Sequence, residues 1–363
     1  MKTQLFLGCL IVLAGGVEAQ SRSALLGRVD SVVSAHMARH QNVGVSIGIE
    51  YRGELLVARG YGAADLESSA PATAETVYRI GSVTKQFTAA LILQLVEQGK
   101  IRLDDEITRF LPDYPTQGRR MTIHHLLTHS SGIRSYTALG PRYATLSRLD
   151  LTEDQLIAEF ANQPFDFEAG AQYRYNTPGY FLLGVIAGKV TGTPYPILVE
   201  QALIAPQGLG SSSYCHNSRL IPKRAHGYAI DQGAVVNDRP ISMNIPAGAG
   251  SLCSNVLDLL AWQRALDGGR VLGPQWLTAM RTGHLKSGAS GEYGYGVSIG
   301  ALQGHRQVAH SGGINGFSAW LANYPDDRLT VVVLTNPANG QASGLGAALA
   351  RLVLGLPAAT PRD

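Results

Sequence analysis

The segment Ile80–Gly99 reads IGSVTKQFTAALILQLVEQG and holds the only S-x-x-K pattern in the chain. Apolar residues recur at helical spacing along it, and Gly99 ends the run. Residues three apart share a helical face, so we expect Ser82 and Lys85 to meet if the helix begins near Ser82. Burial and the positive end of the helix dipole both disfavour a charged lysine, and a neutral lysine accepts a proton from serine. Taken alone, the pattern also fits a serine cap followed by a solvated lysine.

Two other serines lie in a pattern that is typical of a different nucleophile. The sequence GVSIG occurs at 44–48 and again at 296–300, and both copies match the G-x-S-x-G elbow of α/β-hydrolases. That elbow requires a sharp turn from a strand into a helix. Ser46 and Ser298 both lie in strand-like stretches that lead to more strand, so we interpret them as strand residues beside closely packed glycines.

The periodicity along the chain predicts strands near both ends and helices in the middle. The predicted strands are Val43–Tyr51, Glu54–Tyr61, Tyr293–Ile299, Gln307–Ser311, Phe317–Tyr324 and Leu329–Thr335. The predicted helices are Ala24–His40, Ser82–Gln98, Thr122–Thr128, Thr152–Ala161, Tyr180–Val190, Tyr195–Leu203, Asn255–Leu266, Pro274–Arg281 and Gly340–Leu354. The economical arrangement is an α+β fold with one antiparallel sheet built from both termini and a helical insertion. We expect a sheet region over 20–80 and 285–363, an inserted region over 81–284, and a site at the seam between them.

Composition and charge exclude some classes of partner. The chain has 363 residues, 45% of them hydrophobic, and a formal net charge of +3 with no basic block. We therefore expect a substantial core and no binding to nucleic acid.

The N-terminus has the features of a signal peptide over residues 1–19. Lys2 precedes an apolar run over Leu5–Val17, and the small residues Val17 and Ala19 follow at the cleavage-site positions. The run is too short to cross a bilayer, so we expect a periplasmic or secreted protein without a stable membrane span. In an oxidising compartment Cys215 and Cys253 either form a disulfide or remain free, and the sequence leaves both open.

Two further motifs carry candidate chemistry. Tyr175 stands in YRYNTPGY, just before a predicted helix, where a loop tyrosine suits a proton shuttle. His310, Ser311 and Gly312 lie on a predicted strand in AHSGGINGF. The spacing of the histidines in HHLLTHSSG lacks the glutamate of a zinc-protease motif, so we expect no metal and no cofactor.

Together these segments resemble the serine hydrolase family that contains class C β-lactamases, D-alanyl-D-alanine peptidases, D-aminopeptidases and β-lactamase-like esterases. The resemblance covers nearly all of the chain after residue 19. It rests on YRIGSVTKQFTAALILQLVEQGKIRLDDEI, MTIHHLLTHSSGI, YRYNTPGYFLLG, AGAGSLCSNVLDLLAW and HSGGINGFSAWLANYPDDRLTVVVLTN. These motifs are specific for the family and say little about the substrate.

The resemblance implies a role for each matching residue. It implies that Ser82 is the acylated nucleophile, Lys85 its partner and Tyr175 the proton shuttle. The backbone N–H groups of Ser82 and Gly313 would form the oxyanion hole. Substrate-binding positions are then Thr177, where the family usually has Asn, and His310-Ser311-Gly312, which matches the Lys-Thr-Gly of class C β-lactamases and the His-Thr-Gly of some peptidases and esterases.

These departures favour an acyl-serine hydrolase of the D-alanyl-D-alanine peptidase or esterase type over a class C-like β-lactamase. A second alternative is a non-catalytic penicillin-binding-like protein, and the intact Ser82, Lys85 and Tyr175 argue against it. A histidine with an ordinary pKa is mostly neutral at pH 7, so we expect His310 to favour carboxylate-bearing substrates only as the pH falls. We expect a small-molecule or peptide substrate and a monomer.

Overall fold

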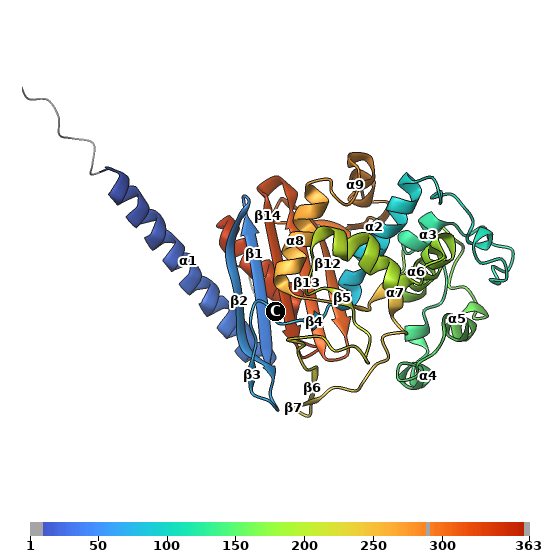
Figure 1. Ribbon diagram of the computed structural model, residues 1–363, viewed down its shortest axis with the longest axis horizontal. Coiled ribbons are helices and arrows are strands. Elements are labelled where there is room, and N and C mark those ends of the chain that lie inside the picture. Colours follow the sequence, from blue (N-terminus) through green and yellow to red (C-terminus); the bar gives the residue numbers. More distant parts are fainter. Residues whose placement is uncertain (1–9, 288–290, 359–363) are drawn as a thin grey trace, which may run out of the picture.

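A computed structural model describes residues 10–287 and 291–358, and one antiparallel sheet dominates it (Figure 1). The two ends of the chain meet in this sheet, because Ile47 of the N-terminal part pairs with Val333 of the C-terminal part. The predicted α+β fold, with one sheet built from both termini, is therefore confirmed. The nine strands run in the order β3 (Ala70–Pro71), β2 (Glu54–Asp65), β1 (Gly44–Tyr51), β14 (Leu329–Asn336), β13 (Phe317–Tyr324), β12 (His305–Ile314), β11 (Ser298–Leu302), β10 (Glu292–Tyr293) and β9 (Leu285–Lys286).

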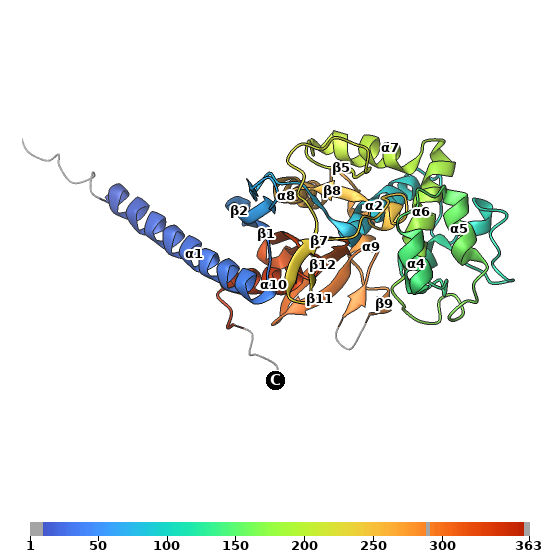
Figure 2. The same ribbon diagram turned by 90° about the horizontal axis from the view of Figure 1, so that it is seen from below.

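Helices cover both faces of the sheet. On one face α10 (Ala342–Leu354) packs on β13 and β14, and α1 (Leu10–His40) lies against α10 (Figure 2). On the other face α8 (Val256–Asp267) packs on β1 and β14 (Figure 1). Because strand side chains alternate, Val45 and Ile47 face the core with α1 and α10, while their neighbours face α8.

The first GVSIG sequence is a strand whose small residues permit this packing. A Cβ atom on Gly48 would lie 3.0 Å from Val256 and 3.1 Å from Leu260 of α8. Ser46 is fully buried in β1 and donates a hydrogen bond of 2.7 Å to the carbonyl of Thr73. Ser46 is therefore a structural residue, as the sequence predicted.

The second GVSIG sequence differs from the prediction in its first half. The strand predicted over Tyr293–Ile299 is divided, because the N–H of Gly294 donates to the carbonyl of Val297 at 2.8 Å and closes a turn between β10 and β11. Gly296 has a φ of +72°, and a Cβ atom there would lie 2.5 Å from the carbonyl oxygen of Lys85. The turn thus brings the chain against the helix that carries Lys85. Ser298 is exposed at the start of β11, with no helix after it.

The remaining helices form a region beside the sheet (Figure 1). Its central helix, α2, is buried along most of its length and packs on α6. Within the described residues no single helix has the length and apolar composition to cross a membrane, although one bent pair, Thr177–Thr191 with Tyr195–Gln207, has both when taken together. The helices of this region are α2 (Thr84–Glu97), α3 (Ile123–Leu127), α4 (Pro141–Leu146), α5 (Glu153–Ala161), α6 (Thr177–Thr191), α7 (Tyr195–Val199) and α9 (Pro274–Met280).

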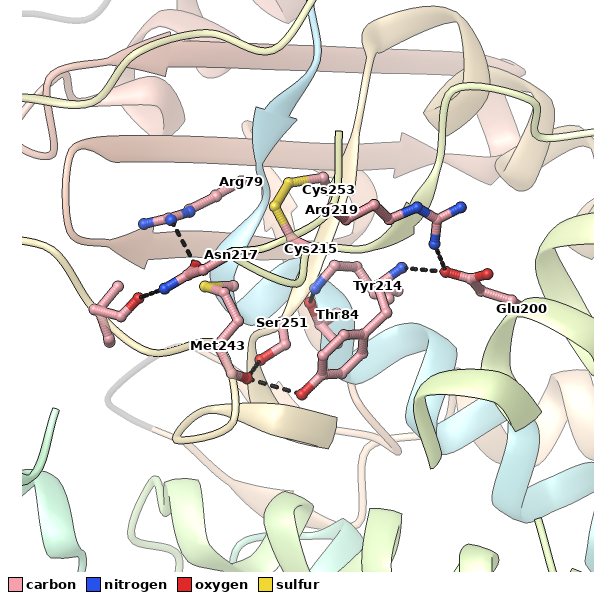
Figure 3. Close-up of a disulfide and its surroundings, with 12 residues drawn as sticks. Arg79, Thr84, Glu200, Tyr214, Cys215, Asn217, Arg219, Met243, Ser251 and Cys253 are labelled. Atoms are coloured by element: carbon pink, nitrogen blue, oxygen red, sulfur yellow. Dashed lines mark hydrogen bonds and ion pairs between the residues drawn. A yellow bond between two sulfur atoms is a disulfide. The ribbon is translucent and has the colours of Figure 1, made fainter. Parts of the chain in front are cut away.

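Several short elements escaped prediction because two to four residues are too few to show a period. A small sheet joins β4 (Tyr78–Arg79), β8 (Leu252–Ser254) and β5 (Ser213–Tyr214), and a separate hairpin joins β6 (Tyr228–Asp231) and β7 (Ala234–Asn237). Cys215 follows β5 and forms a disulfide with Cys253 of β8, with their Cα atoms 5.1 Å apart (Figure 3). Of the two states that the sequence left open for these cysteines, the structure has the disulfide.

At the N-terminus, α1 is continuous from Leu10 to His40. Residues 1–9 of the predicted signal peptide lie outside the described residues. The signal peptide therefore stays a prediction.

Candidate active site

Ser82 and Lys85 meet at the start of the central helix. A single 3-10 turn, Gly81–Val83, leads directly into α2, which places Lys85 in the first turn of that helix. The Lys85 Nζ donates to the Ser82 Oγ at 3.1 Å and to the carbonyl of Ala249 at 2.9 Å. Lys85 is fully buried and Ser82 is half-buried. The predicted contact between these two residues is therefore present.

The surroundings of Lys85 disfavour its charge. Burial lowers the pKa of Lys85 from 10.5 to about 7. The Nζ lies 4.8 Å from the ring centroid of Tyr175 and 5.6 Å from that of Tyr180, and within the described part of the chain no carboxylate forms an ion pair with it. The positive end of the α2 dipole acts in the same direction. At neutral pH a large fraction of Lys85 is therefore uncharged and available as a base.

Tyr175 lies in the loop before α6, as predicted. Asn176 caps that helix, because its Oδ1 accepts a hydrogen bond of 2.8 Å from the N–H of Gly179. Tyr175 keeps 40% of its surface exposed, and burial of the remainder raises the pKa of its phenol, an effect that its interaction with the Ser82 hydroxyl opposes. The phenol is thus protonated at neutral pH. It is a proton donor beside Ser82, and the electrostatics favour Lys85 over a Tyr175 phenolate as the base.

One positioning residue, His129, was missed by the sequence reasoning. Both neighbours of Tyr175 donate to it: the N–H of Arg174 to its carbonyl at 2.9 Å, and the N–H of Asn176 to its Nδ1 at 3.1 Å. Its ring centroid lies 4.4 Å from that of Tyr175, and it is fully buried. His129 therefore fixes the backbone on both sides of Tyr175 and packs against its ring.

The sequence had drawn attention to His129 only as a companion of His125 in a rejected zinc site. The helix α3 ends at Leu127, and His129 has a φ of +57°, so the two histidines do not share a helical face. The sequence feature that could have identified His129 is its position in the HHLLTHSSG motif, a segment that the family resemblance included.

His310 lies on β12 and is almost completely buried. Its Nδ1 lies 2.6 Å from the carbonyl oxygen of Ser311 and its Nε2 lies 3.0 Å from the hydroxyl of Tyr293. Because a carbonyl only accepts, we assign the proton to Nδ1, and Nε2 then accepts from Tyr293. Burial, followed by the charge of Lys85, lowers the pKa of His310 to about 3.

This environment corrects one expectation. The prediction that His310 gains charge between pH 7 and its ordinary pKa is wrong, because a buried imidazole near Lys85 stays neutral through that range. Its ring centroid lies 6.1 Å from that of Tyr175. The predicted meeting of Ser82, Tyr175 and His310 at the seam is confirmed, but His310 supplies no cation there.

The glycines of β12 let the strand approach the nucleophile closely. A Cβ atom on Gly312 would lie 2.0 Å from the carbonyl oxygen of Ile80, and one on Gly81 would lie 3.0 Å from the nitrogen of Gly313. In the two-residue hairpin after β12, Ile314 pairs with Phe317.

Along an antiparallel strand, the N–H groups of successive residues point alternately toward the partner strand and away from it. Because Ile314 forms the hydrogen-bonded pair that closes the hairpin, the N–H of Gly313 points away from β13. The N–H of Ser82 lies in the first helical turn, where it has no intrahelical acceptor. The geometry is compatible with the predicted oxyanion hole. Ser311 is exposed and Thr177 is the half-buried first residue of α6, and their substrate contacts stay predictions.

The disulfide between Cys215 and Cys253 lies in the same region as Thr84, which is two residues after Ser82 (Figure 3). The N–H of Leu252 donates to the Thr84 Oγ1 at 3.1 Å, and the N–H of Ile80 donates to the carbonyl of Leu252 at 3.0 Å. Cys253, the next residue, is bonded to Cys215. Leu252 therefore contacts the residues on both sides of the turn Gly81–Val83 that carries Ser82, which we call the catalytic turn. The disulfide links this segment covalently to the loop after β5.

Comparison with known proteins gives the class and then the family. The fold, with Ser82, Lys85 and Tyr175 gathered at one place, matches the class of serine hydrolases. A family model described as Beta-lactamase matches residues 29–355, so the chain belongs to the β-lactamase family of serine hydrolases. The resemblance inferred from the motifs is confirmed.

Three similar proteins illustrate the breadth of this family. Penicillin-binding protein 4* of Bacillus subtilis (strain 168) is 29% identical over 82% of this chain and 69% of its own length. A D-aminopeptidase of Gluconobacter oxydans (strain 621H) is 28% identical over 85% of this chain and 58% of its own length. The solved structure of an octameric penicillin-binding protein homologue from Pyrococcus abyssi has a TM-score of 0.82 and 30% identity, covering 91% of this chain and 78% of that one.

Proposed function

We propose that this chain is an exported hydrolase that forms an acyl-enzyme on Ser82, and that it acts on esters or on D-alanyl-D-alanine-type peptides. The observation that carries the proposal is the contact of 3.1 Å between the Ser82 Oγ and the Nζ of a buried lysine with a pKa of about 7. A serine hydroxyl is a weak nucleophile, and an adjacent neutral amine is the base that it needs.

The reaction follows from the placement of the groups. Lys85 accepts the Ser82 proton as the Oγ attacks the substrate carbonyl, and the N–H groups of Ser82 and Gly313 stabilise the oxyanion. Tyr175 donates its phenolic proton to the leaving group and recovers a proton from Lys85. Water then attacks the acyl-enzyme with the same groups acting in reverse.

Two features support a peptidase or esterase over a β-lactamase. The strand-motif position that is a lysine in class C β-lactamases is here a neutral, buried His310, so a substrate carboxylate has no cation at that position. Thr177 offers a single hydroxyl where Asn would offer a carbonyl oxygen and an NH2 group at two separate ends of a wider side chain. We expect penicillins to acylate Ser82 slowly and to leave it more slowly. The non-catalytic alternative is disfavoured because Ser82, Lys85 and Tyr175 are all present and in contact.

The proposed export rests on the N-terminal pattern of Lys2 and the apolar run Leu5–Val17. The disulfide between Cys215 and Cys253 is consistent with an oxidising compartment. We propose a periplasmic or secreted location and a small-molecule or peptide substrate. The monomeric state stays a prediction, and the related protein from Pyrococcus abyssi is described as octameric.

The test combines labelling with a substrate panel. Purified protein is treated with a fluorophosphonate probe and with penicillin, and its intact mass is measured. It is then assayed with p-nitrophenyl esters, D-Ala-D-Ala peptides, D-amino-acid amides and nitrocefin. Covalent labelling and turnover of an ester or peptide are expected. No labelling and no turnover would overturn the proposal, and nitrocefin turnover equal to the best ester or peptide rate would favour the β-lactamase alternative.

A further inference from the structure

A cationic pocket lies beside the catalytic turn, and the chemistry described above makes no use of it. It has a volume of about 190 Å³. Three arginines line it, namely Arg79, Arg224 and Arg239, together with His226, and Asp238 is the one acidic residue among the lining residues described. Three guanidinium groups against one carboxylate leave an excess of positive charge.

These arginines have no ion-pair partner in the part of the chain that the structure describes. None of the salt bridges within residues 10–287 and 291–358 includes Arg79, Arg224 or Arg239. Asp238 instead accepts a hydrogen bond of 2.6 Å from the backbone N–H of Arg239. Burial lowers the pKa of Arg79 to about 10; the charge of Arg224 acts in the same direction, and the charge of Asp238 opposes it. An anion placed among these groups would relieve that repulsion.

The fold holds the three arginines in place from different elements. Arg79 lies on β4 opposite Cys253, and its guanidinium donates to the Oδ1 of Asn217 at 3.2 Å (Figure 3). Arg224 forms a backbone bridge with Val77, two residues before Arg79. The disulfide and this bridge thus tie the pocket wall to the strand that precedes Ser82.

Arg239, the third arginine, contacts the turn that follows β12. The carbonyl of Arg239 accepts a hydrogen bond of 3.0 Å from the Nδ2 of Asn315, which also lines the pocket. Phe317 lies on the other side of that turn, with its ring 5.9 Å from the guanidinium carbon of Arg79. The pocket is therefore connected both to the catalytic turn and to the end of β12.

Three parts of the site follow one another along β12 and the turn after it. His310 lies near Tyr175, Gly313 supplies the proposed oxyanion N–H three residues later, and Asn315 borders the pocket two residues beyond. At about 3.3 Å per residue, Gly313 is about 10 Å from His310 and lies between Tyr175 and the pocket. If a substrate carbonyl binds at Gly313 with its leaving group toward the Tyr175 proton donor, its acyl portion lies on the opposite side of Gly313, which is the side of the three arginines.

We propose that this pocket binds an oxyanion, a carboxylate or a phosphate, on the acyl portion of the substrate. The proposal rests on the proposed function, because it names the acyl donors of the same nucleophile. It implies that acyl groups with a distal negative charge are preferred over neutral ones of equal length. A free ammonium on the acyl portion would be repelled by the same groups.

The kinetic test uses p-nitrophenyl esters that differ only in the distal group. Adipoyl, hexanoyl and 6-aminohexanoyl esters carry a carboxylate, a methyl group and an ammonium, and a 5-phosphonopentanoyl ester distinguishes phosphate-like from carboxylate recognition. We expect kcat/KM to be about tenfold higher for an anionic ester than for hexanoyl, and lowest for 6-aminohexanoyl. In the double variant Arg224→Gln/Arg239→Gln the ratio of anionic to neutral kcat/KM should fall toward one. The control Arg52→Gln/Arg270→Gln removes the same charge from exposed arginines outside the pocket and should keep the ratio.

A binding measurement separates failure of the pocket from failure of the proposed function. Calorimetry with adipate and with inorganic phosphate on the Ser82→Ala protein should show binding that the Arg224→Gln/Arg239→Gln substitutions remove. If Ser82 is not labelled and neither esters nor D-Ala-D-Ala peptides are hydrolysed, but the anion binds, the proposed function fails and the pocket remains. If esters are hydrolysed without an anionic preference, or with a preference that survives the double substitution, the pocket proposal is overturned. Absence of both anion binding and anionic preference also overturns it.

Discussion

The candidate site has two ends with opposite electrostatic environments. At its neutral end, around His310 in the middle of β12, the ionisable groups are buried and lean toward neutrality: Lys85 has a pKa of about 7 and His310 of about 3, and burial lowers the pKa of His129 as well. At its cationic end, around Asn315 just after β12, three guanidinium groups face one carboxylate, and none of the three takes part in an ion pair within the described residues.

The difference separates two tasks that need different surroundings. The proposed proton transfer between Ser82, Lys85 and Tyr175 needs an amine that is uncharged at neutral pH, and a low dielectric supplies this by lowering the pKa of Lys85. Recognition of an anion needs permanent charge that the reaction itself does not titrate. A lysine at position 310 would put permanent charge beside Lys85, and its repulsion would further depress the Lys85 pKa. The neutral His310 avoids this while it accepts a hydrogen bond from Tyr293.

The largest expected effect comes from removing the nucleophile between the two ends. Ser82→Ala should lower turnover by a factor on the order of 10⁵ or more, as for other serine nucleophiles, and should abolish covalent labelling. Ser46→Ala and Ser298→Ala are matched controls, because both serines occur in GVSIG sequences and neither lies in the catalytic turn. Intact mass after fluorophosphonate treatment, together with ester turnover, measures both. Full activity in Ser82→Ala would refute the assignment.

A permanent charge at the neutral end should be nearly as damaging. Lys85→Arg keeps the cation but cannot release its proton at working pH, so we expect acylation to fall by about 10³-fold or more. Single-turnover acylation of the folded variant is the appropriate measurement. A Lys85→Arg protein that acylates at the wild-type rate would show that Lys85 acts only as a charge and that the neutral environment is not needed.

The pH dependence distinguishes Lys85 from His310. Because the charged form of Lys85 is inactive, kcat/KM for an uncharged ester should fall below pH 7, by about tenfold for each pH unit. His310, with a pKa of about 3, adds no limb between pH 5 and 8. The profile of His310→Gln should therefore keep a midpoint near 7 even if its rate is lower. A midpoint that moves away with this substitution would assign the titration to His310 instead.

A smaller effect is expected from His129, which acts through Tyr175. His129→Ala should lower kcat by about 10- to 100-fold with little change in KM, because misplacing a catalytic group by about 1 Å has an effect of this size. His129→Asn is the conservative variant: asparagine tolerates a positive φ, and its Oδ1 offers an acceptor where Nδ1 accepted from Asn176. Partial recovery of kcat in the asparagine variant is expected. Equal losses in both variants, in proportion to lost stability, would reduce His129 to a packing role.

The sequence predicted the sheet and the contact between Ser82 and Lys85 because both depend on local signals. Alternation of apolar residues in β1 and β14 identified two strands, and joining them required only that both bury one face. Ser82 and Lys85 are three residues apart on one helical turn, so their meeting needed no tertiary information.

What escaped prediction depends on contacts between distant segments. The turn at Gly294–Val297 brings Gly296 against the carbonyl of Lys85, a contact with a distant segment that periodicity within 293–299 does not show. Arg79, Arg224 and Arg239 are scattered through the chain and belong to no motif, so only the fold shows that they line one pocket. The pKa of His310 was likewise misjudged because burial, and not residue type, determines it.

The smallest expected effect concerns stability, and it tests whether the neutral end has an energetic cost. Lys85 has a pKa of about 7 in the folded protein and 10.5 as an ordinary lysine, so the unfolded chain binds more protons between these values. The resulting penalty to the free energy of unfolding is fully present below pH 7, on the order of 5 kcal/mol at most, and disappears as the pH rises through 10.5.

Lys85→Met removes the amine and fills a similar volume, but it leaves the carbonyl of Ala249 without its donor, which costs about 1–3 kcal/mol. We therefore expect the inactive Lys85→Met protein to be more stable than wild type by about 1–4 kcal/mol at pH 6, with the difference narrowing at pH 9. Urea unfolding at pH 6, 7.5 and 9 measures this difference in stability between the two proteins. A difference that does not change with pH would mean that Lys85 carries its charge at no cost, and that the two ends of the site do not differ as inferred.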